Sequence, residues 1–260
     1  PAIKEGRVIS VLLSAYCYRR TAICDIHSTG VTMQDLLRES LSHWSLLLCW
    51  LLLMVPALIW VVRDLTTKNA HLAPMMKWVW GLTTLYSGVV GLLVYRFAGR
   101  RQIAANGDAR KGLRSVAHCY SGCGLGEFVG VSLAVGLLAM GNISTAIITF
   151  IFAYLFGFLL TVGPMLQGGS DDKPQVIRDA FKSETASIVV MEVVAISVDL
   201  WLAGGAGMHQ PLFWNSLIIS LSLGLLAAWP VNVWLVKHGV KGGMADPRET
   251  DPQAQHHAHC

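Results

Sequence analysis

The chain has 260 residues and a mean hydropathy of +0.51, and only 14% of its residues are charged. Soluble domains carry about 25% charged residues, so this composition excludes a surface built mainly for water. The formal net charge is +4. The basic residues do not gather into a patch interleaved with aromatic residues, however, so we expect no nucleic-acid partner.

Residues 1–42 are expected to form an N-terminal cytoplasmic or interfacial segment. Val8 to Tyr18 is apolar, but it is short for a membrane span and lacks the small-residue cleavage site of a secretory signal. Gln34 to Leu41 has the pattern of a short amphipathic helix, which we place on the inner surface of the membrane.

Five apolar windows follow and predict a transmembrane domain over residues 43–240. They are Trp44–Val62, Trp78–Tyr95, Val116–Val162, Ala186–Leu202 and Phe213–Val236. The third window is long enough for two spans joined by a tight turn near Gly141 and Asn142. The hydrocarbon core of a bilayer is about 30 Å thick, and a helix satisfies its own backbone there. We therefore predict an all-α polytopic membrane protein with six transmembrane helices.

The basic residues predict the orientation of these helices. All but three of the 20 Lys and Arg fall before the first helix, in the second and fourth connections, or in the tail. The three exceptions are Arg63, Lys68 and Lys77. Because Lys and Arg concentrate on the cytoplasmic side, this split predicts that both the N and the C terminus are cytoplasmic.

Residues 241–260 are predicted to form a mobile, polar cytoplasmic tail. The tail ends in a tract rich in His and Cys, namely His256, His257, His259 and Cys260. Such a tract can capture a metal ion, or it can simply be a solvated chain end.

The third predicted helix carries glycines at four-residue spacing, Gly122, Gly126 and Gly130. This stripe lets the backbone of a neighbouring helix approach closely, and it also offers a docking face for a membrane-protein partner. Gly122 and Gly124 resemble the start of a dinucleotide-binding loop. That interpretation fails because Glu127 stands where the third glycine belongs and no strand precedes the helix.

The same helix carries a candidate metal site. Cys119 and Cys123 are four residues apart and so share one helix face, with His118 beside them and Glu127 one turn deeper. Met165, at the inner end of the fourth helix, would add a thioether. Thiolate and imidazole suit Cu(I) and Zn(II), so the possible cofactor is copper or zinc. The alternative is that the cysteines are small apolar fillers of the core.

Three acidic residues lie inside predicted spans, Glu127, Glu192 and Asp199. An ionised carboxylate at the bilayer centre costs about 2.5 to 3.5 kcal/mol even on the insertion scale, so such residues are functional candidates. Glu192 and Asp199 share one face of the fifth helix, and we expect Glu127 and Glu192 to meet near the midplane. They would form an ion or proton pathway. The alternative is a pair of neutral carboxyls that bridge helices by hydrogen bonds.

Several motifs of known chemistry are absent. The sequence contains no G-x-x-x-x-G-K-[ST], no H-E-x-x-H and no G-x-S-x-G. Nucleotide-driven pumping by this chain alone and standard hydrolysis are therefore not expected, and a role as an enzyme is less favoured than binding or transport.

Roughly residues 40 to 240 resemble an uncharacterised family of bacterial membrane proteins, defined only as a domain of unknown function. The resemblance rests on His118-Cys119, Gly122-Cys123, Gly126-Glu127, Pro164-Met165, Met191-Glu192, Phe213-Trp214 and Pro230-Val231-Asn232. It implies a multi-pass protein of the bacterial inner (plasma) membrane, and it brings no established activity or site.

Three functional hypotheses remain open. The first is a membrane protein that binds or translocates a transition-metal cation, with copper as the first choice. The second is a non-catalytic subunit of a larger membrane complex, docked through the glycine stripe. The third is a proton-coupled carrier of a small solute that uses the three membrane-embedded acids.

Overall fold

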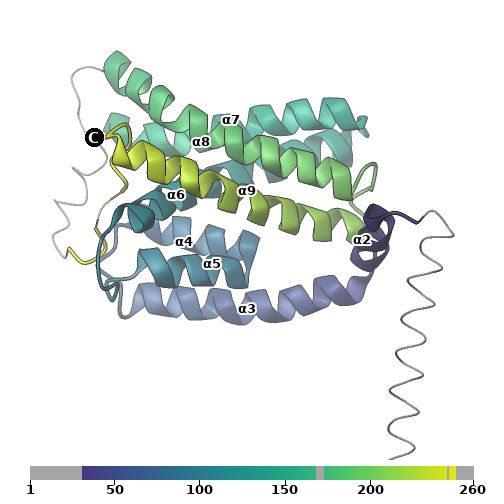
Figure 1. Cartoon of the computed structure of the whole chain (residues 1–260), viewed down its shortest axis with the longest axis horizontal. Coiled ribbons are helices and arrows are strands. Elements are labelled where there is room, and N and C mark those ends of the chain that lie inside the picture. The colour runs from purple at the N-terminus through teal and green to yellow at the C-terminus, as the bar shows by residue number, and fades with distance from the viewer. Residues whose placement is uncertain (1–30, 168–172, 245, 250–260) are drawn as a thin grey trace, which may run out of the picture. The chain divides into compact units, whose positions relative to one another are not determined.

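The computed structural model describes residues 31–167, 173–244 and 246–249, and it divides into a part that ends at Ser40 and a compact part from Leu41 onward (Figure 1). All regular structure in these ranges is helical, which confirms the predicted all-α class. The apolar segment Val8–Tyr18 and the tail residues His256, His257, His259 and Cys260 lie outside the described residues.

The first described helix is α2 (Met33–Leu41), which confirms the helix predicted from Gln34. Its start is capped reciprocally. The Asp35 backbone N–H donates to Thr32 Oγ1 at 3.2 Å, and the Thr32 backbone N–H donates to Asp35 Oδ2 at 2.9 Å. This pairing satisfies N–H groups that a helix start leaves free. The Thr32 hydrogen bonds also lower the pKa of the Asp35 carboxyl.

The part after Ser40 is a bundle of helices. In chain order these are α3 (Trp44–Thr66), α4 (Pro74–Ser87), α5 (Val89–Val94), the π-helix η1 (Tyr95–Gly99), α6 (Asp108–Val131), the π-helix η2 (Ser132–Leu137), α7 (Asn142–Gln167), α8 (Lys173–Leu202) and α9 (Pro211–Lys237). Five of them, counting η2 as the continuation of α6, are long and apolar enough to cross a membrane. By the length and composition of its helices, the chain is therefore a multi-pass membrane protein.

The second predicted span differs from the structure, because its residues form two short helices rather than one long one. The chain turns at Gly88, whose φ of +55° is a left-handed conformation that glycine adopts without strain. α5 then returns alongside α4, and a Cβ atom at Gly91 would lie 2.6 Å from the Thr83 carbonyl oxygen. Further back, the rings of Trp80 and Tyr95 are 5.4 Å apart. The six-span prediction is therefore not confirmed at residues 74–99.

The tip of this α4–α5 hairpin stops inside the bundle. A Cβ atom on Gly88 would lie 3.1 Å from Nε1 of Trp50, so the tip is level with Trp50 of α3. At 1.5 Å rise per residue, that position is about 9 Å short of the start of α3 at Trp44. A cavity of about 410 Å³ between α3, α4, α6 and α9 extends beyond the tip.

Because the hairpin starts and ends at the same end of the bundle, all basic residues of the bundle lie in the half next to that end. We call this the basic end: it holds the chain segments 66–74, 99–108 and 237–244, together with the end of α7 and the start of α8 (Figure 1, left). Bonds across it include that from Trp229 Nε1 to the Ala109 carbonyl and that between His71 Nε2 and the Pro247 carbonyl, 2.9 and 2.8 Å long. Every Lys and Arg after Ser40 lies in the half of the bundle next to this end.

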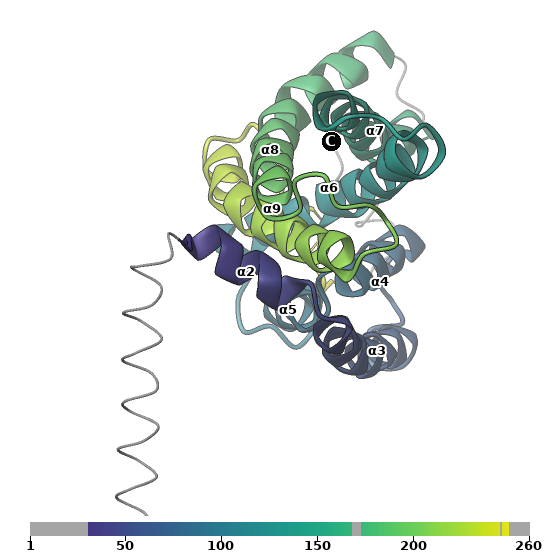
Figure 2. The ribbon, with the colours of Figure 1, turned by 90° about the vertical axis from the view of Figure 1, so that its right-hand side faces the viewer.

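The opposite end, here the neutral end, faces the viewer in Figure 2 and holds the start of α3 and the α6–α7 and α8–α9 connections. Asn215 Nδ2 of α9 donates to the Leu41 carbonyl there at 2.8 Å. Residues 138–142 and 203–210 contain no Asp, Glu, Lys or Arg. The structure thus corrects the sequence prediction for Arg63, Lys68 and Lys77, which lie at the same end as the other basic residues.

The glycine stripe packs within the chain. A Cβ atom on Gly122 would lie 2.8 Å from Gly157 Cα, one on Gly126 would overlap the Phe152 carbonyl, and one on Gly130 would lie 2.8 Å from Thr149 Cα. All three contacts are with α7. The predicted helix packing is therefore present. The suggestion that Gly122, Gly126 and Gly130 receive a membrane-protein partner is wrong for this fold, because α7 already covers that face.

Candidate functional site

The interior of the bundle contains two buried carboxyl groups that come from different helices. Glu127 of α6 is 2% exposed and Glu192 of α8 is fully buried. The two carboxyls lie within electrostatic reach of each other. By helix rise, each lies about 15 Å from the neutral end of its helix, close to the middle of a bilayer-sized bundle. The structure therefore places both acids in the interior of the bundle at similar depth.

These carboxyls are poorly satisfied by their surroundings. Among the described residues, both oxygens of Glu192 and Oε2 of Glu127 are buried and accept no hydrogen bond. No Lys or Arg occurs in residues 115–172 or 183–236, which include the neighbouring parts of α6, α7, α8 and α9. A buried carboxylate without a cation is costly, so a proton or another cation has to accompany each negative charge here.

Two thiols adjoin this pair of acids. Cys119 Sγ and Cys123 Sγ are 3.9 Å apart and both are fully buried. They lie next to the Glu192 carboxyl, without making a hydrogen bond of normal geometry to it. Cys123 Sγ also lies against Gly157 of α7, so the α6 face that carries Cys119 and Cys123 lies between α7 and α8.

His118 lies in another direction. Its ring is 1% exposed, and Nδ1 is 3.5 Å from Thr161 Oγ1 of α7. In the part of the chain that the structure describes, no three His, Cys, Asp or Glu side chains are gathered closely enough to hold a metal ion. Met165 belongs to α7, but its side chain is outside the described atoms. The predicted site His118, Cys119, Cys123, Glu127 and Met165 is therefore only partly assembled.

Asp199 connects the acid pair with the neutral end. It lies on the same face of α8 as Glu192, and its Oδ1 accepts a hydrogen bond of 2.9 Å from Ser216 Oγ of α9. Asp199 also lines a cavity of about 90 Å³ between the α6–α7 and α8–α9 connections, together with Met140 and Asn142. The face of α8 that carries Glu192 and Asp199 therefore borders this cavity at the neutral end.

Nearer the basic end, the same face of α8 carries Glu184, which forms a buried ion pair with Lys241. Lys241 Nζ lies 2.7 Å from Glu184 Oε2 and 2.9 Å from Asn232 Oδ1, and Lys241 is only 8% exposed. The amide of Asn232 also donates to Ser187 of α8. Lys241 reaches this position because the chain reverses after α9 at Gly239, where φ is +69°.

Sequence analysis missed this second network. Glu184 lies two helical turns before Glu192 and so shares its face, which the spacing of the acids along α8 could have indicated. Lys241 follows the last helix, in residues predicted to be a mobile tail, and no periodic pattern marks it. Only the folded backbone shows that its amine returns into the bundle.

We expect Lys241→Met to destabilise the protein by about 3 to 5 kcal/mol, because it leaves the buried Glu184 carboxylate without its cation. Thermal unfolding of the purified protein in detergent measures the effect. Glu184→Gln combined with Lys241→Met removes both charges, so the double variant should be more stable than Lys241→Met alone. Equal losses in the single and double variants would show that the ion pair contributes nothing specific.

The comparisons with known proteins place this chain in one family. A model described as a domain of unknown function, DUF4396, matches residues 110–241. The chain belongs to this family. The matched region runs from the first turn of α6 to Lys241, so it contains the glycine stripe, all three membrane-embedded acids and the Glu184–Lys241 pair. The resemblance stated from the sequence is confirmed, although the match begins later in the chain. No curated protein and no solved structure matches the chain.

Proposed function

We propose that the protein is a proton-coupled membrane carrier in which Glu127 and Glu192 bind and release the coupling proton. The observation that carries this proposal is the pair itself: two buried carboxyls from different helices, within electrostatic reach of each other, with oxygens that accept no hydrogen bond and far from any Lys or Arg in sequence. Acidic side chains that face the interior of a membrane bundle commonly mark proton or ion pathways.

The polar groups along α8 support a path through the bundle. Asp199, Glu192 and Glu184 share one face, at spacings of about 10 to 12 Å along the helix. Such gaps are too long for direct transfer, so protons would move through intervening hydroxyls, thiols or water. Ser216 next to Asp199 and Cys123 next to Glu192 are groups of this kind.

We further propose that the basic end faces the cytoplasm of a bacterium, across its inner membrane. The support is the position of every Lys and Arg after Ser40 in the basic half, since such residues are retained on the cytoplasmic side. With five crossings and a hairpin that enters and leaves at the basic end, Leu41 lies on the outside and Lys237 on the inside. The earlier expectation of both termini in the cytoplasm is replaced by this arrangement.

Reporter fusions test the orientation. Fusions after Ala70, Gly107 and Gln175 should all report the cytoplasm, and one after Gly205 should report the outside. The fusion after Ala70 is decisive, because a sixth span at residues 78–95 would place it outside. A periplasmic signal at Ala70 with a cytoplasmic signal at Gly107 would restore the six-span arrangement.

Proton flux in reconstituted vesicles tests the function. Vesicles containing the protein and a pH-sensitive dye are given an inward proton gradient, and the protein should accelerate acidification of the lumen. The double variant Glu127→Gln with Glu192→Gln should not do so, since an amide does not exchange a proton. Equal rates with empty vesicles, wild type and variant would contradict the proposal.

A second candidate is binding or transport of a transition-metal cation, with copper first and zinc second. The observation in its favour is the pair of buried thiols 3.9 Å apart beside the Glu192 carboxyl. Thiolates favour Cu(I) and also bind Zn(II), and in the described residues no third His, Cys, Asp or Glu is close enough to complete a site. Metal analysis of the purified protein distinguishes the two functions: stoichiometric metal that is lost in Cys119→Ser supports this candidate.

A further inference from the structure

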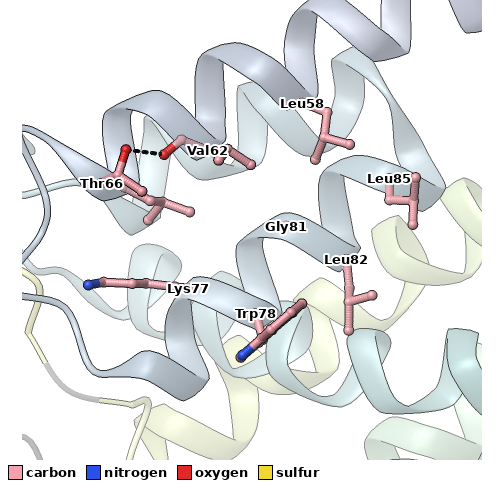
Figure 3. A pocket seen from close by; sticks show the side chains of 9 residues that line it. Leu58, Val62, Thr66, Lys77, Trp78, Gly81, Leu82 and Leu85 are labelled. Carbon is pink, nitrogen blue, oxygen red and sulfur yellow. Dashed lines mark hydrogen bonds between the residues drawn. The ribbon is translucent and has the colours of Figure 1, made fainter.

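A groove runs along the outside of the bundle between α3 and α4. Its volume is about 360 Å³, and Figure 3 shows the side chains that line it. They are Leu58, Val62, Leu65, Thr66, Lys77, Trp78, Gly81, Leu82 and Leu85. On each helix the lining extends over about 12 Å. Val62 and Trp78 are 47% and 73% exposed, so this apolar groove opens on the surface of the bundle.

One of the lining residues of the groove, Gly81, is a glycine that no protein contact requires. A Cβ atom on Gly81 would meet nothing within 4 Å, whereas the glycines of α6 lie against the backbone of α7. Glycine inside a helix costs about 1 kcal/mol relative to alanine. At Gly81 the missing side chain therefore opens space along the groove and does not allow a closer approach of two helices.

The polar atoms of the groove lie at its basic end. Thr66 Oγ1 is already engaged, since it donates to the Val62 and Arg63 carbonyls at 2.9 and 3.1 Å. Lys77 Nζ donates to the Ala70 carbonyl at 2.6 Å, which leaves two of its three N–H groups for another acceptor. The rest of the lining is apolar apart from the indole of Trp78, a residue type that prefers the level of lipid headgroups.

We propose that this groove binds one molecule of an anionic phospholipid, with an acyl chain along Gly81 and the phosphate on Lys77. The groove has the chemistry of such a ligand, an apolar channel with a cation at one end. It also has the right position, because Lys77 lies at the basic end, where the other basic residues of the bundle gather and where a negatively charged headgroup is attracted. A neutral lipid fills the channel but gains nothing from Lys77.

Native mass spectrometry of the detergent-solubilised protein tests this proposal, with phosphatidylglycerol and phosphatidylcholine as probes. The wild-type protein should retain one phosphatidylglycerol, with about fivefold preference over phosphatidylcholine, as expected for one Lys near a lipid surface. Lys77→Gln should lower phosphatidylglycerol binding about fivefold, to the level of phosphatidylcholine. Gly81→Phe should abolish retention of both lipids, because the ring fills the channel.

Gly163→Phe is the matched control, since a Cβ atom at Gly163 also meets nothing within 4 Å and lies outside the groove. This variant should retain the lipid as the wild type does, and elution of all variants as one species in size exclusion shows that they are folded. Unchanged lipid retention in Gly81→Phe overturns the proposal. So does equal binding of the two lipids to the wild type, or equal loss in Gly163→Phe.

Discussion

Glu192→Gln is expected to lower proton flux through reconstituted vesicles by roughly a hundredfold or more, as for the removal of other proton-transferring side chains. The amide has nearly the same shape as the carboxyl and keeps a hydrogen-bonding oxygen, but it cannot take up and release a proton. Glu192 is fully buried, so the change alters no surface. Under the proposed function the two carboxyls act as a pair, so Glu127→Gln should behave in the same way.

Folding is not expected to suffer from this change. An amide removes the cost of a buried charge, so Glu192→Gln should insert into the membrane and unfold at or above the temperature of the wild type. Asp179→Asn is a suitable control, since Asp179 lies on the exposed side of the same helix and bonds only to Gln175 in the described structure. Wild-type flux in Glu192→Gln would mean that the buried carboxyls are purely structural.

Gly126→Leu should prevent stable folding, with a cost of more than about 3 kcal/mol. Even a Cβ atom at this position overlaps the Phe152 carbonyl and approaches Ala153 Cα to 2.7 Å. Both atoms belong to the α7 backbone, which cannot move aside as a flexible side chain would. The expected result is loss of the monodisperse peak in size exclusion and little protein in the membrane fraction.

The control for this experiment is Gly163→Leu on α7. It adds the same side chain to a glycine with open space around it, so it should accumulate and purify like the wild type. The comparison separates a close helix contact from a general intolerance of larger residues. If Gly126→Leu folds as well as Gly163→Leu, the α6–α7 contact at Gly126 is not as close as the structure has it.

The long helices could be predicted, because each contains an apolar window of span length without Lys or Arg, and the α6–α7 turn is marked by Gly141 and Asn142. The hairpin could not be read from hydropathy, since Trp78–Tyr95 is apolar throughout whether it continues straight or turns. The positions of Arg63, Lys68 and Lys77 could have indicated the hairpin. As one straight span, the window leaves three basic residues on the wrong side, and the turn at Gly88 removes all three exceptions.

The candidate site could be predicted where the spacing of residues along a helix determines which side chains share a face. Glu192 and Asp199 are one heptad apart, and Cys119 and Cys123 are four residues apart, so each pair shares a face. Adjacent residues do not, and His118 consequently points to Thr161 rather than towards the thiols. Which helix lies opposite each face depends on tertiary packing, and periodicity within one helix carries no information about it.

The α4–α5 hairpin also bears on how the protein is made. Its tip, residues 87–89, carries no charge and stays inside the bundle, so its insertion requires no translocation of a hydrophilic loop. The tip contacts Trp50 of α3, which is synthesised before it, and Tyr120 of α6, which is synthesised after it. The hairpin therefore completes its contacts only when α6 has entered the membrane.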